Sequence, residues 1–155
     1  MKTSGKYHMK DYIEKLKDYQ KGDLLFDYYE STIVLEDDGS NRKEYLEITL
    51  SKHDEKTVRA NVYTRNKDDE EEKNVEYYLS INILDEVYKI VTDHKMIGWN
   101  NLSNPYSLDG KLYVCKFRHQ GKLMRVSSDS MTSKGETAFS LILDTLSKAI
   151  SKAKD

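Results

Sequence analysis

Residues 43–65 read KEYLEITLSKHDEKTVRANVYTR, in which two alternations of apolar and polar residues flank a short polar link. The apolar members of the two runs are Leu46, Ile48, Leu50, Val58, Ala60 and Val62. A period of two is typical of a strand that buries one face, and the link KHDEK is short enough for a hairpin. These residues therefore predict two antiparallel strands, at 43–51 and 57–65.

Further strands are predicted on both sides of this pair. LLFDYYESTIVLE (24–36) is rich in aromatic and β-branched residues and ends at the turn-forming DDGSN, and NVEYYLSINI (74–83) alternates like the central runs. Downstream, KLYVCKF (111–117) and KLMRVSS (122–128) are separated only by RHQG. Short links between strands favour antiparallel pairing.

Three helices are predicted from apolar residues at helical spacing. The first covers residues 9–20, the second begins at Leu84, and the third opens at Ser133. The resulting order, α-β-β-β-β-α-β-β-α, defines an α+β fold with two layers, in which helices pack on one face of a mainly antiparallel sheet. We expect residues 1–155 to form one domain, with residues 1–8 flexible.

The chain has 155 residues, one cysteine and no apolar run that approaches the length of a membrane span. The lysines of the opening MKTSGKYHMKDY are not followed by the apolar segment of a signal peptide. A lone cysteine excludes an internal disulfide and fits a reducing compartment. These features predict a soluble cytoplasmic protein that does not associate with a membrane.

Charge is distributed unevenly: residues 23–100 carry ten basic and nineteen acidic residues, whereas the whole chain has a net charge of −2. An acidic surface disfavours nucleic acid and favours a basic protein partner. A predicted hairpin tip at 66–74 contains a run of acids that would steer such a partner, namely Asp68, Asp69, Glu70, Glu71 and Glu72. A solvated acidic face without a partner is the open alternative.

Sequence motifs for catalysis, metal binding or phosphate binding are absent. The four histidines lack the i, i+4 spacing of a zinc site and have no cysteine beside them. Cys115 alternates with Tyr113 and Phe117 in a predicted strand, which favours a buried thiol over a nucleophile. We therefore expect no metal, no cofactor and no enzymatic activity, with an active site assembled from distant residues as the open alternative.

The candidate binding residues lie on the face of the predicted sheet that is opposite the apolar positions. They are Tyr45, Arg59, Tyr63, Arg65, Glu76 and Tyr78. Tyrosine and arginine anchor many protein interfaces because each combines a large contact area with a polar end. The same residues suit an ordinary solvated sheet, but three tyrosines on one open face favour an interface.

The only tryptophan, Trp99, follows Gly98 at the predicted end of the second helix. We expect Gly98 to take the left-handed conformation of a helix cap, and Trp99 to fold back on the helix end as a plug. Trp99 would then be mostly buried, whereas Tyr63 and Tyr78 would be mostly exposed.

From Val87 onward, the chain carries VYKIV, GWNN, LDG (108–110), KLYVCKF, GKLMRVSS and AFSLILDTL. This succession of a short amphipathic helix, a tryptophan followed by asparagine, a loop ending in DG, a β-hairpin and a final amphipathic helix resembles small uncharacterised proteins of Firmicutes. The resemblance covers less than half of the chain. It implies a two-layer fold and a bacterial source, and it brings no activity with it.

Together these observations favour a non-enzymatic protein-binding module, most concretely an immunity-type inhibitor of a bacterial toxin. Two alternatives stay open. The order of elements resembles that of the small acidic dimeric chaperones of type III secretion, although this chain has one strand more. An enzyme or small-ligand binder with a site built from distant residues is the other alternative.

Overall fold

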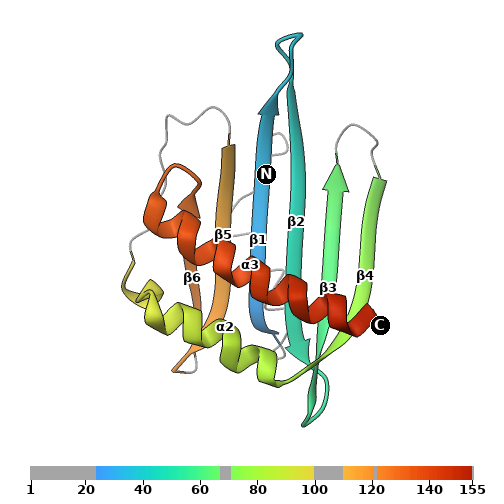
Figure 1. The fold of residues 1–155 in the computed structure, drawn as a ribbon, viewed down its shortest axis with the longest axis vertical. Helices are drawn as coiled ribbons and strands as arrows, with labels where there is room; N and C mark the ends of the chain where they lie inside the picture. The colour runs from blue at the N-terminus through green and yellow to red at the C-terminus, as the bar shows by residue number, and fades with distance from the viewer. Residues whose placement is uncertain (1–23, 67–70, 100–109, 121, 155) are drawn as a thin grey trace.

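A computed structural model of the chain describes residues 24–66, 71–99, 110–120 and 122–154. They form an antiparallel sheet of six strands in the order β4-β3-β2-β1-β5-β6 (Figure 1). The strands are β1 (Leu24–Leu35), β2 (Asn41–Lys52), β3 (Thr57–Asn66), β4 (Glu71–Ser80), β5 (Gly110–His119) and β6 (Lys122–Asp129). All neighbouring strands in this order are antiparallel.

Two α-helices, α2 (Asn82–Asp93) and α3 (Ser133–Lys154), lie across the same face of the sheet, and the short 3-10 helix η1 (Met96–Gly98) follows α2 (Figure 1). The α+β class, the antiparallel sheet and the predicted order from the first strand onward are therefore confirmed. The helix predicted at 9–20 and the flexible segment predicted at 1–8 lie outside the described residues.

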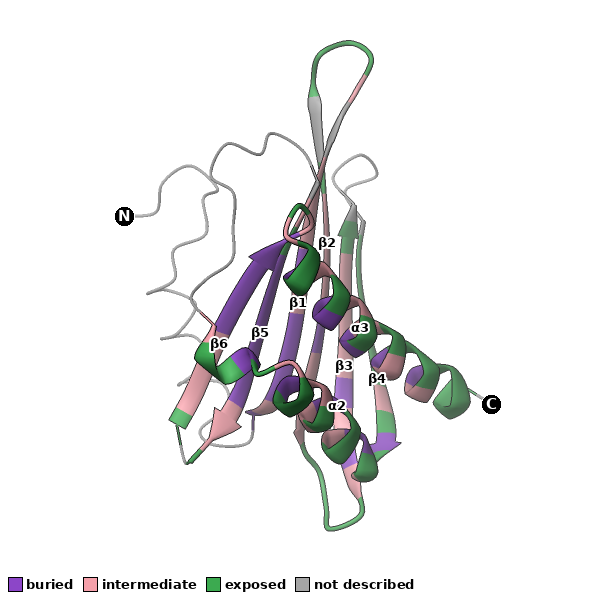
Figure 2. Cartoon of the chain, turned by 60° about the vertical axis from the view of Figure 1, so that its left-hand side comes forward, coloured by how far each residue is buried: buried purple, intermediate pink, exposed green. Residues whose placement is uncertain are grey.

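The hydrophobic core lies between the two helices and the sheet face that they cover (Figure 2). Its main members on the strands are Phe26, Tyr28, Ile48, Leu50, Val58, Ala60, Leu79, Tyr113, Cys115, Phe117 and Val126. The helices contribute Val87, Val91, Phe139, Ile142 and Leu146, which recur at helical spacing. The core is thus formed by the apolar alternation of the strands and the apolar stripes of the helices.

The strand predicted at 74–83 begins earlier, at Glu71, and ends at Ser80. Ile83, which the alternation assigns to that strand, instead lies buried in α2. Ile83, Val87 and Val91 are the buried residues of α2, so Ile83 begins the apolar stripe of the helix. An apolar residue between β4 and α2 fits both the two-residue period of the strand and the 3.6-residue period of the helix.

The acidic hairpin tip predicted at 66–74 is shorter than expected. β3 continues to Asn66 and β4 starts at Glu71, so most of the expected tip belongs to the paired strands. Arg65 lies opposite Glu72, with 3.9 Å between Nη1 and Oε1. Cross-strand pairs of opposite charge stabilise a ladder, which accounts for pairing that extends into the acidic run.

The corner after α2 differs from the predicted cap. The helix ends at Asp93, and the left-handed residue is Lys95 (φ 54°), whereas Gly98 lies in η1. Trp99 is half-buried against the core, and its Nε1 donates to the carbonyl of His94 at 3.1 Å. Trp99 therefore packs at this corner, as predicted, but it is less buried than expected.

Candidate protein-binding site

Alternation along β2, β3 and β4 directs a set of aromatic and polar side chains away from the helices. Ile48, Ala60 and Leu79 are buried on the covered face, so their immediate neighbours along each strand lie on the other face. The six predicted binding residues all lie there, and we call them the Tyr/Arg face: Tyr45, Arg59, Tyr63, Arg65, Glu76 and Tyr78. The strand register thus brings residues from three strands together.

Side-chain contacts orient the members of the Tyr/Arg face. Tyr45 lies opposite Arg65, and Arg59 lies opposite Tyr78. Arg59 Nε is 3.5 Å from Glu76 Oε2, and the Tyr78 hydroxyl donates to Glu76 Oε1 at 2.9 Å. Exposed ion pairs contribute at most about 1 kcal/mol to stability. These contacts therefore position the side chains more than they stabilise the fold.

Exposure distinguishes the tyrosines of this face. Tyr78 is 49% exposed, in agreement with the prediction for it. Tyr45 and Tyr63 are half-buried, so Tyr63 is less exposed than predicted. Partial burial raises the pKa of the Tyr63 hydroxyl, and the Glu72 carboxylate raises it further. Tyr78 is therefore the most accessible aromatic side chain of the Tyr/Arg face.

The acidic residues predicted to steer a partner are placed only in part. Asp68, Asp69 and Glu70 lie outside the described residues. Glu71 opens β4, and Glu72 is exposed beside Arg65. Glu72 thus carries negative charge at the margin of the Tyr/Arg face.

A row of charged residues that the sequence analysis did not single out crosses the same sheet face over β1, β5 and β6. Asp27 lies opposite Thr49 and Lys116, and Lys116 lies opposite Arg125. Asp27 and Lys116 are buried, and the Thr49 hydroxyl donates to Asp27 Oδ1 at 2.9 Å. Burial raises the pKa of the Asp27 carboxyl, and the neighbouring Glu47 raises it further. This sheet face therefore has a buried part, and the Tyr/Arg face is its more exposed part.

Lys116 makes the stability of the fold depend on pH. Burial, with a smaller contribution from Arg125, lowers the pKa of its ammonium group from 10.5 to about 7. Above the lowered pKa, the unfolded chain keeps a proton that the folded chain has lost. The contribution of Lys116 to the free energy of unfolding therefore rises with pH, by at most about 1.4 kcal/mol per unit between about pH 7 and 10.

We expect Lys116→Met to reduce this dependence on pH. Urea unfolding of the two proteins between about pH 7 and 9 measures the difference in slope. Lys122→Met is the matched control, because Lys122 is exposed on β6, and it should keep the slope of the wild type. Identical slopes for the wild type and Lys116→Met would contradict the lowered pKa of Lys116.

Within the part of the chain that the structure describes, no group of three or more His, Cys, Asp and Glu side chains could hold a metal ion. Cys115 is fully buried, and burial raises the pKa of its thiol, which disfavours the reactive thiolate. Among the described helices, none combines the length and the apolar character that crossing a bilayer requires.

Comparison with other proteins identifies neither a family nor a function for this chain. No protein-family model and no curated protein matches the sequence. The function is therefore inferred from the fold and from the Tyr/Arg face.

Proposed function

We propose that this chain is a non-enzymatic protein-binding module that holds its partner on the Tyr/Arg face. The observation that supports this proposal most is Tyr78, which is 49% exposed and hydrogen-bonded to Glu76, with Arg59 directly opposite. An accessible aromatic ring beside an arginine is typical of the residues that anchor protein interfaces. The most concrete form of the proposal is an immunity-type inhibitor of a bacterial toxin.

The surroundings of Tyr78 suit the centre of an interface. The ring of His53 lies 4.6 Å from the ring of Tyr78, and Arg65 and Glu72 form a second exposed pair at 3.9 Å. Protein interfaces typically place aromatic and arginine side chains at the centre and polar groups at the rim. Side chains that are already oriented lose less conformational entropy when a partner binds.

The excess of acidic residues in the first two thirds of the chain favours a basic partner. Residues 23–100 contain β1 to β4 and α2, and they carry nineteen acidic against ten basic residues. Complementary charge accelerates the encounter of two proteins more than it strengthens the final complex. In this proposal the acids guide the partner, and the tyrosines and arginines hold it.

Removing two tyrosine rings is expected to abolish most of the binding. Tyr63→Ala/Tyr78→Ala should weaken the complex by about 100-fold or more, because each interface anchor typically contributes about 2 kcal/mol or more. The partner is first captured from an extract of the native host on the immobilised full chain. Its affinity for the wild type and for the variant is then measured by calorimetric titration.

The matched control is Met131→Ala/Leu141→Ala, which removes two exposed apolar side chains next to and on α3. This variant should bind the partner as the wild type does. The proposal is contradicted if the tyrosine variant, with an unchanged circular dichroism spectrum, binds as tightly as the wild type.

A further inference from the structure

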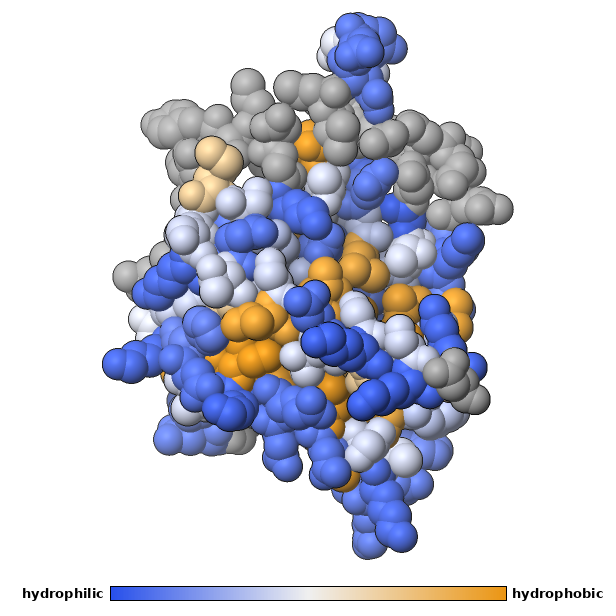
Figure 3. All heavy atoms as spheres, in the orientation of Figure 1, coloured by the Kyte–Doolittle hydropathy of each residue, from blue (hydrophilic) through white to orange (hydrophobic). Residues whose placement is uncertain are grey.

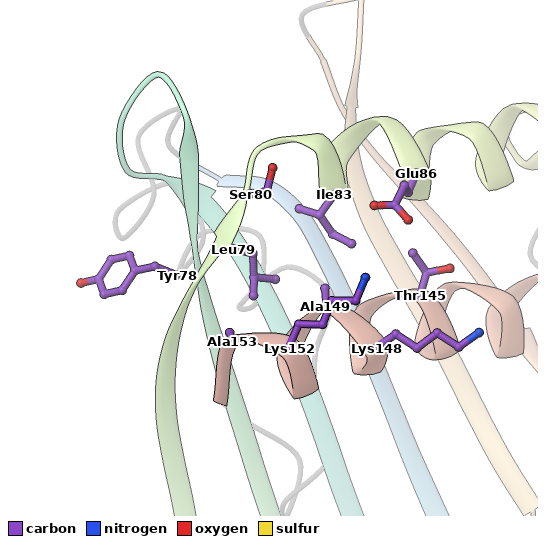
Figure 4. A pocket seen from close by; sticks show the side chains of 10 residues that line it. All are labelled: Tyr78, Leu79, Ser80, Ile83, Glu86, Thr145, Lys148, Ala149, Lys152 and Ala153. Atoms are coloured by element: carbon purple, nitrogen blue, oxygen red, sulfur yellow. The ribbon is translucent and has the colours of Figure 1, made fainter. Parts of the chain in front are cut away.

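A pocket of about 460 Å³ lies between the end of β4, α2 and the last turns of α3 (Figure 4). Leu79 and Ile83 are buried side chains in its wall, and Ala149 of α3 adds a third apolar surface. Lys148, Lys152 and Glu86 stand at its margin. The ring of Tyr78 points away from the pocket, so this site is separate from the centre of the Tyr/Arg face.

The pocket adjoins an edge of the sheet. β4 is the last strand in the sheet order, and among the described residues only β3 pairs with it. Residues 71–76, EEKNVE, are rich in charge, which discourages pairing with another chain along that part of the edge. Residues 77–80, YYLS, carry no charge, and Tyr78, Leu79 and Ser80 among them line the pocket. Charge thus discourages pairing with another chain along residues 71–76 of β4, whereas residues 77–80 lack that protection.

The surroundings of this available edge are mainly positive. Lys148 and Lys152 are exposed and lie one turn apart on α3, against the single acid Glu86 from α2. Lys154 adds a further cation, with its Nζ 5.8 Å from the centre of the Tyr77 ring. On this side of the molecule, apolar residues are visible as several separate areas among hydrophilic ones (Figure 3). A ligand that combines an aliphatic side chain with a nearby carboxylate fits both features.

We propose that residues 77–80 of β4 accept an extended acidic peptide of a partner protein as an added strand, with one aliphatic side chain in the pocket. Backbone hydrogen bonds along an open edge supply affinity in such complexes, and a neighbouring pocket selects the side chain. Every second side chain of the peptide points to the same face, so a carboxylate two residues from the aliphatic side chain reaches Lys148 or Lys152. The proposed site shares Tyr78 with the Tyr/Arg face, but it uses the backbone of that residue, whereas the Tyr78 ring points away from the pocket.

Selection from a phage-displayed library of random heptapeptides on the full chain tests the proposal. We expect the enriched peptides to place an aliphatic residue two positions from an aspartate or glutamate. Synthetic versions should lose at least about tenfold in affinity to Ala149→Phe, which fills the pocket, and to Lys148→Glu/Lys152→Glu, which reverses the charge of its margin. Because both lysines are exposed, the charge variant tests the site even where the larger side chain disturbs packing.

Thr137→Phe on an exposed position of α3 and Lys122→Glu on β6 are the matched controls, and both should bind the peptides as the wild type does. Tyr63→Ala should also leave peptide binding unchanged, so the result is separate from that for the Tyr/Arg face. Enrichment without the acidic and aliphatic pattern would overturn the proposal. So would a peptide affinity that neither pocket variant changes.

Discussion

Phe139→Ala is expected to lower the free energy of unfolding by about 3–5 kcal/mol, the range for truncation of a buried phenylalanine. Phe139 is fully buried on α3, and its ring centre lies 5.1 Å from that of Tyr113 on β5 and 6.3 Å from that of Tyr28 on β1. It therefore joins the helix to two strands of the sheet. Alanine would leave a cavity at this junction, because neighbouring side chains in a packed core collapse only in part.

Urea unfolding, followed by the fluorescence of the single tryptophan and by circular dichroism, measures this loss. Leu141→Ala is the matched control on the same helix, because Leu141 is 41% exposed. We expect it to cost less than about 1 kcal/mol. A loss for Phe139→Ala as small as that of the control would show that α3 does not pack on the sheet through this ring.

Gly135→Ala is expected to lower the free energy of unfolding by about 3 kcal/mol, at the upper end for an overpacked core. Gly135 is buried near the start of α3, and an added Cβ would overlap both Oγ and Cβ of Ser128 on β6. On an exposed helix the same exchange would stabilise the fold by about 1 kcal/mol. A decrease in the free energy of unfolding, rather than an increase, would therefore show that α3 approaches β6 closely at Gly135.

Ser128→Gly removes the two atoms that the new Cβ would meet. Alone, it should cost about 1 kcal/mol, because glycine weakens the interior of a strand. In that background, Gly135→Ala should cost little more, and thermal unfolding of the single and double variants measures the coupling. If the double variant loses the sum of the two single losses in the free energy of unfolding, the cost of Gly135→Ala does not come from a clash with Ser128.

The strands could be predicted from the sequence because most alternate residues on the covered face of the sheet are apolar. In β2 and β3, each of the alternate residues Ile48, Leu50 and Ala60 lies in the core, as the period of two indicates. The position of the left-handed residue after α2 was predicted wrongly. The left-handed residue after α2 is Lys95, whose carbonyl accepts the N–H of Gly98 at 3.2 Å, although glycine is the statistically favoured residue for that conformation.

The sequence identifies the sheet face that carries the candidate site, but it does not identify the exposed part of that face. Asp27 and Lys116 alternate with apolar and aromatic residues in the same way as Glu76 does, yet the first two are buried and Glu76 is exposed. Alternation reports the direction of a side chain relative to its neighbours. Burial depends on what packs over the strand, which is a property of the tertiary structure.

A partner protein bound to the Tyr/Arg face would cover the side chains there, and cysteine footprinting measures that coverage. Asn61 lies within this face, opposite Thr49 on β2 and Glu76 on β4. Asn61 is half-buried, whereas the only native cysteine, Cys115, is fully buried, so a thiol introduced by Asn61→Cys is the more accessible of the two. Maleimide alkylation is measured with and without the captured partner, for Asn61→Cys and for Leu141→Cys on α3.

We expect the partner to slow alkylation of Asn61→Cys strongly and to leave that of Leu141→Cys unchanged. An unchanged rate for Asn61→Cys in a partner complex of full occupancy would show that the partner does not bind the Tyr/Arg face.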